Sequence, residues 1–216
     1  MGYGDDLLIT AFAAKIKKKY PERQIVIGNS KEGTAFYSRV WDHNPNIADC
    51  RNLSKNKPVH LIDYHSENRP YIDHEKSTTS KMIWNKKFKP VPGEIYFSNE
   101  EISDANNILI DAKKFWNKNN KKNFKKIIFL ETSSIKINNF QLSIKHQNKD
   151  WGYENWIQLV NKIKNDNLII HSIHDETKII DGIYSPKEMN FRTACAILKL
   201  SDLYIGPEGG FGHVAA

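Results

Sequence analysis

Cysteine and long apolar runs are both scarce in this chain of 216 residues. The two cysteines, Cys50 and Cys195, lie far apart and outside any CxxC motif, so neither a zinc site nor a disulfide framework is implied. The apolar stretch Leu7 to Ala14 is too short to cross a bilayer, and it follows two aspartates where a signal peptide has positive charges. A reduced, cytoplasmic protein is therefore expected.

Basic charge is present in excess but without the pattern of a nucleic-acid binder. A formal net charge of +7 arises from scattered lysines and favours anionic partners. The densest basic run, 118–126, is interrupted by asparagines and holds a single aromatic residue, Phe124. We interpret this run as a solvated linker and expect no nucleic-acid partner. The charge also permits peripheral association with an anionic inner membrane.

Apolar periodicity predicts strands that alternate with helices, typical of a parallel sheet covered on both faces. An irregular middle, 66–98, and the polar run divide the pattern into two Rossmann-like domains, 1–116 and 126–216. No strand precedes the first glycine turn, and the chain stops where a helix starts, so we expect a missing first strand and an incomplete second domain. Strands are predicted at 24–28, 59–64, 127–130, 168–173 and 203–205, and helices at 7–16, 104–115, 154–163 and 191–200.

The segment Gly2-Tyr3-Gly4-Asp5-Asp6 places a glycine turn and two carboxylates before the first predicted helix. Glycine permits a positive φ and close backbone approach. An aspartate in this position caps free N–H groups and interacts favourably with the helix dipole, and capping alone explains one of the two. The functional alternative is that one carboxylate acts as a general base toward a substrate hydroxyl.

Two later segments precede helices and suit a phosphate group. In 148–156, Lys149 lies beside a predicted helix start, where an ammonium group and free N–H groups can meet one anion; Trp151 and Trp156 are interpreted as packing residues. In 205–216, consecutive glycines follow a strand, at the edge of an α/β sheet where ligands bind. The glycine segment is neither a Walker loop nor a GxGxxG fingerprint, and a tight packing turn is the alternative.

Histidine pairs and a loop arginine are weaker candidates. His171 and His174 fall in or just after a strand and are expected to point to opposite faces, which argues against a shared metal. His60, Asp63 and His65 form a similarly weak set. Arg69, in Asn68-Arg69-Pro70-Tyr71, offers a guanidinium group to an anionic acceptor.

The order and spacing of three segments resemble glycosyltransferase family 9, which includes the ADP-heptose:lipopolysaccharide heptosyltransferases. The resemblance covers nearly the whole chain. A divergent branch of that family is echoed in Trp41 to Asn46, Asn68 to Tyr71 and Pro92 to Tyr96. The main motifs are Gly4-Asp5 before an apolar helix, Lys149-Asp150-Trp151 with Trp156, and Ser201-Asp202-Leu203 leading into Gly206-Pro207-Glu208-Gly209-Gly210 and His213-Val214-Ala215-Ala216.

The resemblance implies an inverting glycosyltransferase with the two-domain GT-B fold, a nucleoside-diphosphate-sugar donor and a glycan or lipopolysaccharide-type acceptor. It implies that Asp5 is the catalytic base, with Gly4 and Arg69 on the acceptor side. Donor binding falls to Lys149, Glu208, Gly209, Gly210 and His213. Glu208 stands where the family more often has aspartate. Because a lysine and a helix start can stabilise the leaving diphosphate, no metal or other cofactor is expected.

Two other classes of protein remain open at this point. A Rossmann-like protein that binds a nucleotide or phosphate without transferring sugar would use the same glycine turn. A basic nucleic-acid-binding module would show binding that depends steeply on salt.

Overall fold

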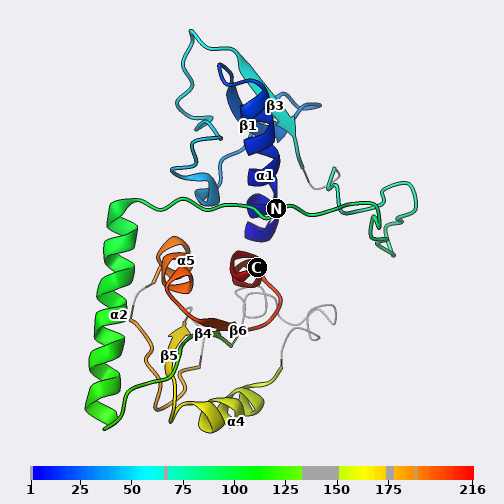
Figure 1. Ribbon diagram of the computed structural model, residues 1–216. Helices are drawn as coiled ribbons and strands as arrows, with labels where there is room; N and C mark the ends of the chain where they lie inside the picture. Colours follow the sequence, from blue (N-terminus) through cyan, green and yellow to red (C-terminus); the bar gives the residue numbers. More distant parts are fainter. Residues whose placement is uncertain (1, 66–67, 133–150, 174–177, 188) are drawn as a thin grey trace. The chain divides into compact units, whose positions relative to one another are not determined.

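The chain folds as two compact units, Met1–Tyr96 and Phe97–Ala216, in a computed structural model that describes residues 2–65, 68–132, 151–173, 178–187 and 189–216. Both units combine helices with a small sheet that contains parallel strands (Figure 1). The predicted α/β class is confirmed. The two-domain GT-B arrangement stays a prediction.

The first unit is built on a three-stranded sheet in the order β2-β1-β3. The central strand is buried from Ile25 to Asn29 and has the apolar core Ile25-Val26-Ile27, as expected of a strand covered on both faces. Strand β3 pairs with it in parallel and β2 pairs antiparallel, while α1 packs beside β1. The elements are α1 (Tyr3–Lys19), β1 (Gln24–Asn29), β2 (Thr34–Ala35), η1 (Arg39–Trp41) and β3 (Val59–Asp63).

The segment around Gly93 runs directly against α1. A Cβ atom at Gly93 would collide with the backbone carbonyl of Leu7, so only glycine allows this approach. The next residue, Glu94, donates its N–H to Thr10 Oγ1 at 2.8 Å. This contact fixes the end of the irregular middle onto α1. Apart from an isolated bridge between Ile72 and Trp84, the described part of 66–98 holds no strand or helix, as predicted.

The second unit contains a parallel sheet in the order β5-β4-β6. Strand β4 lies in the centre, and its apolar residues Ile128, Phe129 and Leu130 are buried. The predicted strands and helices of this region are all present within the described residues. The elements of this unit are α2 (Asn99–Asn119), β4 (Ile127–Glu131), α4 (Tyr153–Ile163), β5 (Leu168–Ser172), α5 (Phe191–Lys199), β6 (Leu203–Ile205) and α6 (Gly210–Ala215).

Alternate side chains of β4 pack on opposite faces of this sheet. Leu130 belongs to a core cluster with Trp156 and Val160 of α4. Phe129 points the other way and meets the ring of Phe211 in α6 edge to face, with centroids 5.4 Å apart. Burial on both faces explains why β4 is a continuous apolar run rather than an alternating one. The expected coverage of both faces is confirmed for this sheet.

Helix α2 belongs to the second unit, whereas the sequence analysis assigned it to the first domain, 1–116. Its buried residues, Leu109 and Trp116 among them, form an apolar face, and the helix packs against α5. The polar run 118–126 therefore lies inside the second unit. Two ion pairs hold it there: the ammonium groups of Lys122 and Lys125 lie 2.6 and 3.0 Å from the Asp166 carboxylate.

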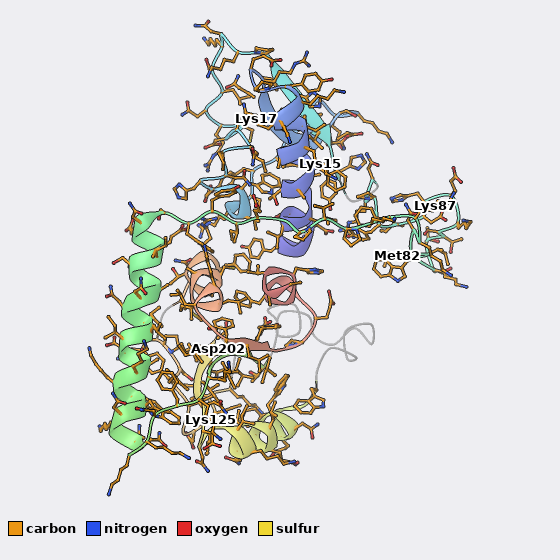
Figure 2. All side chains as sticks on the ribbon, in the orientation of Figure 1. Lys15, Lys17, Met82, Lys87, Lys125 and Asp202 are labelled. Carbon is orange, nitrogen blue, oxygen red and sulfur yellow. The ribbon has the colours of Figure 1, made fainter. Side chains whose placement is uncertain are left out.

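Asp202, labelled in Figure 2, joins the first residues of β4 and β6. Its Oδ2 accepts the backbone N–H of Ile127 at 2.8 Å, and Oδ1 lies 3.4 Å from Lys126 Nζ. These bonds lower the pKa of the Asp202 carboxyl, the backbone hydrogen bond most of all. Asp202 thus sets the register of β6, whose other end leads into the glycine turn.

Candidate active site

Asp5 lies in the first turn of α1, and its carboxylate is held from two sides. Arg69 Nη2 lies 3.0 Å from Oδ2, and the Tyr71 hydroxyl donates to Oδ1. The Asp5 side chain is 13% exposed and that of Arg69 is 26% exposed. Asp5 and Arg69 were predicted separately, for catalysis and for acceptor binding. The structure brings them together as an ion pair within the first unit.

The helix that carries Asp5 begins at Tyr3, not after Asp6 as predicted. Asp5 occupies the third helical position and accepts the N–H of Gly2 at 3.4 Å. A carboxylate in the first turn stabilises a helix start in this way. Gly4 is therefore a helical residue and does not adopt the positive φ expected of a turn glycine.

Two buried donors beside Asp5 lack a hydrogen-bond partner among the described residues: the Tyr64 hydroxyl and Arg69 Nε. Burial raises the pKa of Tyr64 well above its usual range, and the negative charge of Asp5 raises it further. Buried polar groups are normally paired. Tyr64 was not among the predicted site residues, although its place directly after β3, at the carboxyl end of a parallel strand, is a signal that could have identified it.

Asp6, the second carboxylate of the motif, has a structural role. It is 8% exposed and accepts a hydrogen bond from Ser38 Oγ at 2.7 Å. Its backbone carbonyl accepts the indole N–H of Trp41 at 2.8 Å. Burial raises the pKa of Asp6, and the hydrogen bond from Ser38 offsets part of that rise. The two aspartates thus have different roles. Asp6 holds η1 against α1, whereas Asp5 binds Arg69 and Tyr71.

The glycine turn of the second unit follows β6 at the carboxyl edge of the parallel sheet, as predicted. Strand β4 lies between β5 and β6, so the connection from β4 to β5 and the connection from β5 to β6 run in opposite directions across the sheet. In open α/β sheets, ligands bind beside such a reversal. Glu208 and His213 flank Gly209 and Gly210, and His213 Nε2 lies 3.5 Å from Glu208 Oε1. His213 is thus a partner of the Glu208 carboxylate.

Glu131 and Tyr204 connect this turn to the central strand. The Tyr204 hydroxyl lies 2.6 Å from Glu131 Oε2 and 3.1 Å from the carbonyl oxygen of Pro207. A Cβ at Gly206 would collide with the Tyr204 ring and lie 3.0 Å from Glu131 Cβ, so glycine is required there. Neither side chain was predicted as part of a site, and a glutamate at a strand end is ordinarily solvated.

Glu131 is expected to make the stability of the second unit depend on pH. Burial raises the pKa of this 3% exposed carboxyl from 4.5 to about 7, and the Tyr204 hydrogen bond lowers it only in part. Because the folded state holds the proton more tightly, the free energy of unfolding falls as pH rises from about 4.5 to about 7 and levels off above that range. Glu131→Gln should raise the free energy of unfolding by up to about 3 kcal/mol at about pH 8.5 and leave it unchanged near about pH 4.

Urea unfolding of the Glu131→Gln variant at both pH values measures this effect. The exposed Glu154→Gln is the matched control, since it removes a carboxylate from the same unit without changing a buried group. An equal stability change for Glu131→Gln at both pH values would contradict the pH dependence.

His171 is a core residue of the second unit. It is fully buried, with Nε2 2.9 Å from Thr132 Oγ1 and Nδ1 3.4 Å from Ser185 Oγ. His174 lies outside the described residues. In the first unit, His65 Nε2 lies 3.7 Å from Asp63 Oδ1, whereas the His60 ring stacks on Tyr20. Within the described ranges, no three His, Cys, Asp or Glu side chains gather as metal ligands.

Lys149, the predicted diphosphate ligand, lies outside the described residues, as does Asp150. The two tryptophans that follow are in contact, with ring centroids 4.8 Å apart and planes at 82°. Trp156 is 5% exposed and packs into the α4 core, as predicted, while Trp151 is 50% exposed. The segment thus supplies a packing residue, and the role of Lys149 stays a prediction.

Comparisons of the chain with family models, curated proteins and solved structures found no match. Among the described helices, none has the length and apolar character needed to span a membrane. The fold defines the protein as mixed α/β. Its function must be argued from the chemistry of two groups of residues, those around Asp5 and those of the glycine turn after β6.

Proposed function

We propose that the chain is an inverting, metal-independent glycosyltransferase of the GT-B type, similar to family 9. It would move a sugar, heptose or a similar one, from a nucleoside-diphosphate donor to a glycan or lipopolysaccharide-type acceptor. The observation that carries the proposal is the Asp5 carboxylate, held by Arg69 and Tyr71 beside two buried donors that lack partners.

Asp5 has the chemistry of a general base for an acceptor hydroxyl. Its two oxygens offer about four acceptor positions, and the contacts with Arg69, Tyr71 and the Gly2 N–H leave room for one more donor. Asp5 takes the proton as the acceptor oxygen attacks the anomeric carbon, and the bond to the diphosphate breaks with its electrons leaving on the diphosphate. One displacement inverts the anomeric configuration.

The second unit would hold the donor. In this proposal Lys149 and the turn formed by Glu208, Gly209 and Gly210, with His213, bind the diphosphate and stabilise the charge that develops on it. Support comes from the place of the turn, beside the strand reversal at the carboxyl edge of a parallel sheet. The basic net charge of the chain favours such an anionic ligand.

A panel of nucleoside-diphosphate sugars tests the proposal. At least one donor should raise the melting temperature of the protein and release nucleoside diphosphate, slowly alone and faster with an acceptor, and the rate should be unchanged in EDTA. Stabilisation by the nucleotide alone, with no release from any sugar donor, would instead identify a non-catalytic nucleotide-binding protein. Binding to DNA or RNA that weakens steeply with salt would contradict both readings.

A further inference from the structure

The Tyr204 hydroxyl lies between two oxygen atoms that both accept hydrogen bonds. Glu131 Oε2, at the end of β4, is 2.6 Å away, and the carbonyl oxygen of Pro207, in the glycine turn, is 3.1 Å away. Strands β4 and β6 are neighbours in the sheet (Figure 1), so the side chains of Glu131 and Tyr204 come from adjacent strands. A hydroxyl group carries a single proton, so Tyr204 cannot donate fully to both acceptors at once.

Tyr204 keeps its proton, because its surroundings oppose ionisation of the hydroxyl. Burial raises the pKa of Tyr204 well above its usual range, and the negative charges of Glu131 and Glu208 raise it further. Gly206 packs so closely over the hydroxyl that a Cβ atom there would collide with it. Burial raises the pKa of Glu131 to about 7. The member of the pair that gains or loses a proton near neutral pH is therefore Glu131.

Within the described part of the chain, no cation forms an ion pair with Glu131. Arg192 is instead paired with Glu101, and the His213 ring lies 3.5 Å from Glu208. The hydroxyl of Tyr204 is thus the contact through which a change of charge on Glu131 acts. The titratable and charged groups on the elements around Glu131 are His171 on β5, Cys195 and Arg192 on α5, Glu101 on α2, Tyr204 on β6, Glu208 in the turn and His213 on α6.

We propose that Tyr204 is a positioning residue for the glycine turn and that the proton on Glu131 decides which acceptor it binds. An ionised Glu131 attracts the hydroxyl proton, because a hydrogen bond to a charged oxygen is stronger than one to a neutral carbonyl. A protonated Glu131 donates to the Tyr204 oxygen and frees the hydroxyl proton for the Pro207 carbonyl. The protonated state then has a continuous chain of hydrogen bonds from β4 to the turn, and the bonds of such a chain strengthen one another.

The hydrogen bond from Tyr204 fixes the peptide group between Pro207 and Glu208. A peptide group is planar, so the direction of the Pro207 carbonyl sets the direction of the Glu208 N–H. The turn is therefore held in one orientation when Glu131 is protonated and released when Glu131 is ionised. The consequence for the donor rests on the proposed function. Because preorganised N–H groups stabilise a diphosphate best, donor affinity should fall as Glu131 ionises.

Isotope-edited infrared spectroscopy of the protein without ligand tests the hydrogen bond directly. The chain is labelled with proline that carries ¹³C at its carbonyl carbon, and the Pro207 band is identified by its change in Tyr204→Phe. In the unmodified chain this band should move to higher frequency between about pH 5.5 and about pH 8.5, because the carbonyl loses a hydrogen bond. It should stay low at both pH values in Glu131→Gln, whose amide donates to Tyr204, and high at both in Tyr204→Phe.

Tyr153→Phe is the matched control for Tyr204→Phe. The Tyr153 hydroxyl donates to the Ile179 carbonyl at 2.7 Å in the same unit, so its loss removes a similar bond away from the turn. The proline bands of this variant should shift with pH as in the unmodified chain. Glu131→Gln keeps the shape of the side chain and Tyr204→Phe keeps the ring, so the fold is expected to persist in both.

Calorimetric titration with ADP-glucose, whose two phosphates keep a constant charge over this pH range, tests the effect on the turn. At about pH 8.5, Glu131→Gln should bind about three- to tenfold more tightly than the unmodified chain, the usual contribution of one hydrogen bond. At about pH 5.5, Tyr204→Phe should bind about three- to tenfold more weakly than the unmodified chain. Simple repulsion by the Glu131 charge predicts no difference for Tyr204→Phe at the lower pH.

A Pro207 band that is the same at both pH values, or a pH shift that persists in Tyr204→Phe or Glu131→Gln, would overturn the proposal. Equal affinity of Tyr204→Phe and the unmodified chain for ADP-glucose at the lower pH would also overturn it. The outcome is separable from that of the proposed function. A protein that shows the infrared shifts and binds no nucleoside-diphosphate sugar would keep this inference and lose the enzyme.

Discussion

Asp5→Asn is expected to reduce the rate of sugar transfer by about 10²- to 10⁴-fold, the usual contribution of a positioned general base. The amide keeps the shape of the side chain and can still accept from Tyr71, but it cannot take the proton of an acceptor hydroxyl. The loss should fall on kcat more than on KM for the acceptor, because the ligand contacts remain. Initial rates of nucleoside diphosphate release in the presence of acceptor measure it.

Asp111→Asn is the matched control for Asp5→Asn. Asp111 is an exposed aspartate on α2 whose carboxylate pairs with Lys114 at 2.9 Å, so its replacement removes the same charge without touching the site. Its rate should equal that of the unmodified chain. If Asp5→Asn retained more than about half of the activity while remaining folded, Asp5 would be a helix-capping residue and not the base.

The second large effect concerns the stability of the second unit. Arg192 on α5 is 4% exposed and donates through Nη2 to Glu101 Oε2 of α2 at 2.9 Å and through Nε to Oε1. Glu101 also accepts the Ser98 N–H at 2.8 Å and so caps its own helix. Glu101→Ala should lower the free energy of unfolding by about 3–5 kcal/mol, because it leaves the buried guanidinium group without this carboxylate.

Urea unfolding of Glu101→Ala, followed by far-UV circular dichroism, tests this expectation. Glu100→Ala serves as the control, since Glu100 is an exposed carboxylate in the same helical turn; its effect should stay below about 0.5 kcal/mol. A loss below about 1 kcal/mol for Glu101→Ala would show that the ion pair contributes little more than an exposed one.

Local sequence signals predicted the elements of this chain well, because burial on both faces of a sheet leaves a distinct pattern. The runs 25–27, 128–130 and 168–170 are short and apolar, and each forms the core of a buried strand. The start of α1 was not predicted, because two glycines close together are typical of a turn. The Asp5 carboxylate extends the helix through Tyr3 and Gly4.

The packing of elements against one another was harder to predict, since the sequence of a helix shows its apolar face but not the element on which that face packs. The apolar face of α2 was evident, but its packing on α5, and hence its place in the second unit, depends on contacts distant along the chain. The same holds for the site. Asp5 and Arg69 were each predicted, yet their ion pair joins residues 64 positions apart, and Tyr64 was not predicted at all.

The anomeric configuration of the transferred sugar tests the central claim most directly. With a donor found in the panel, NMR of the product should show the configuration opposite to that of the donor, because a base that activates the acceptor leads to one displacement. A product with the donor's configuration would require two displacements or another mechanism, and it would contradict the role assigned to Asp5.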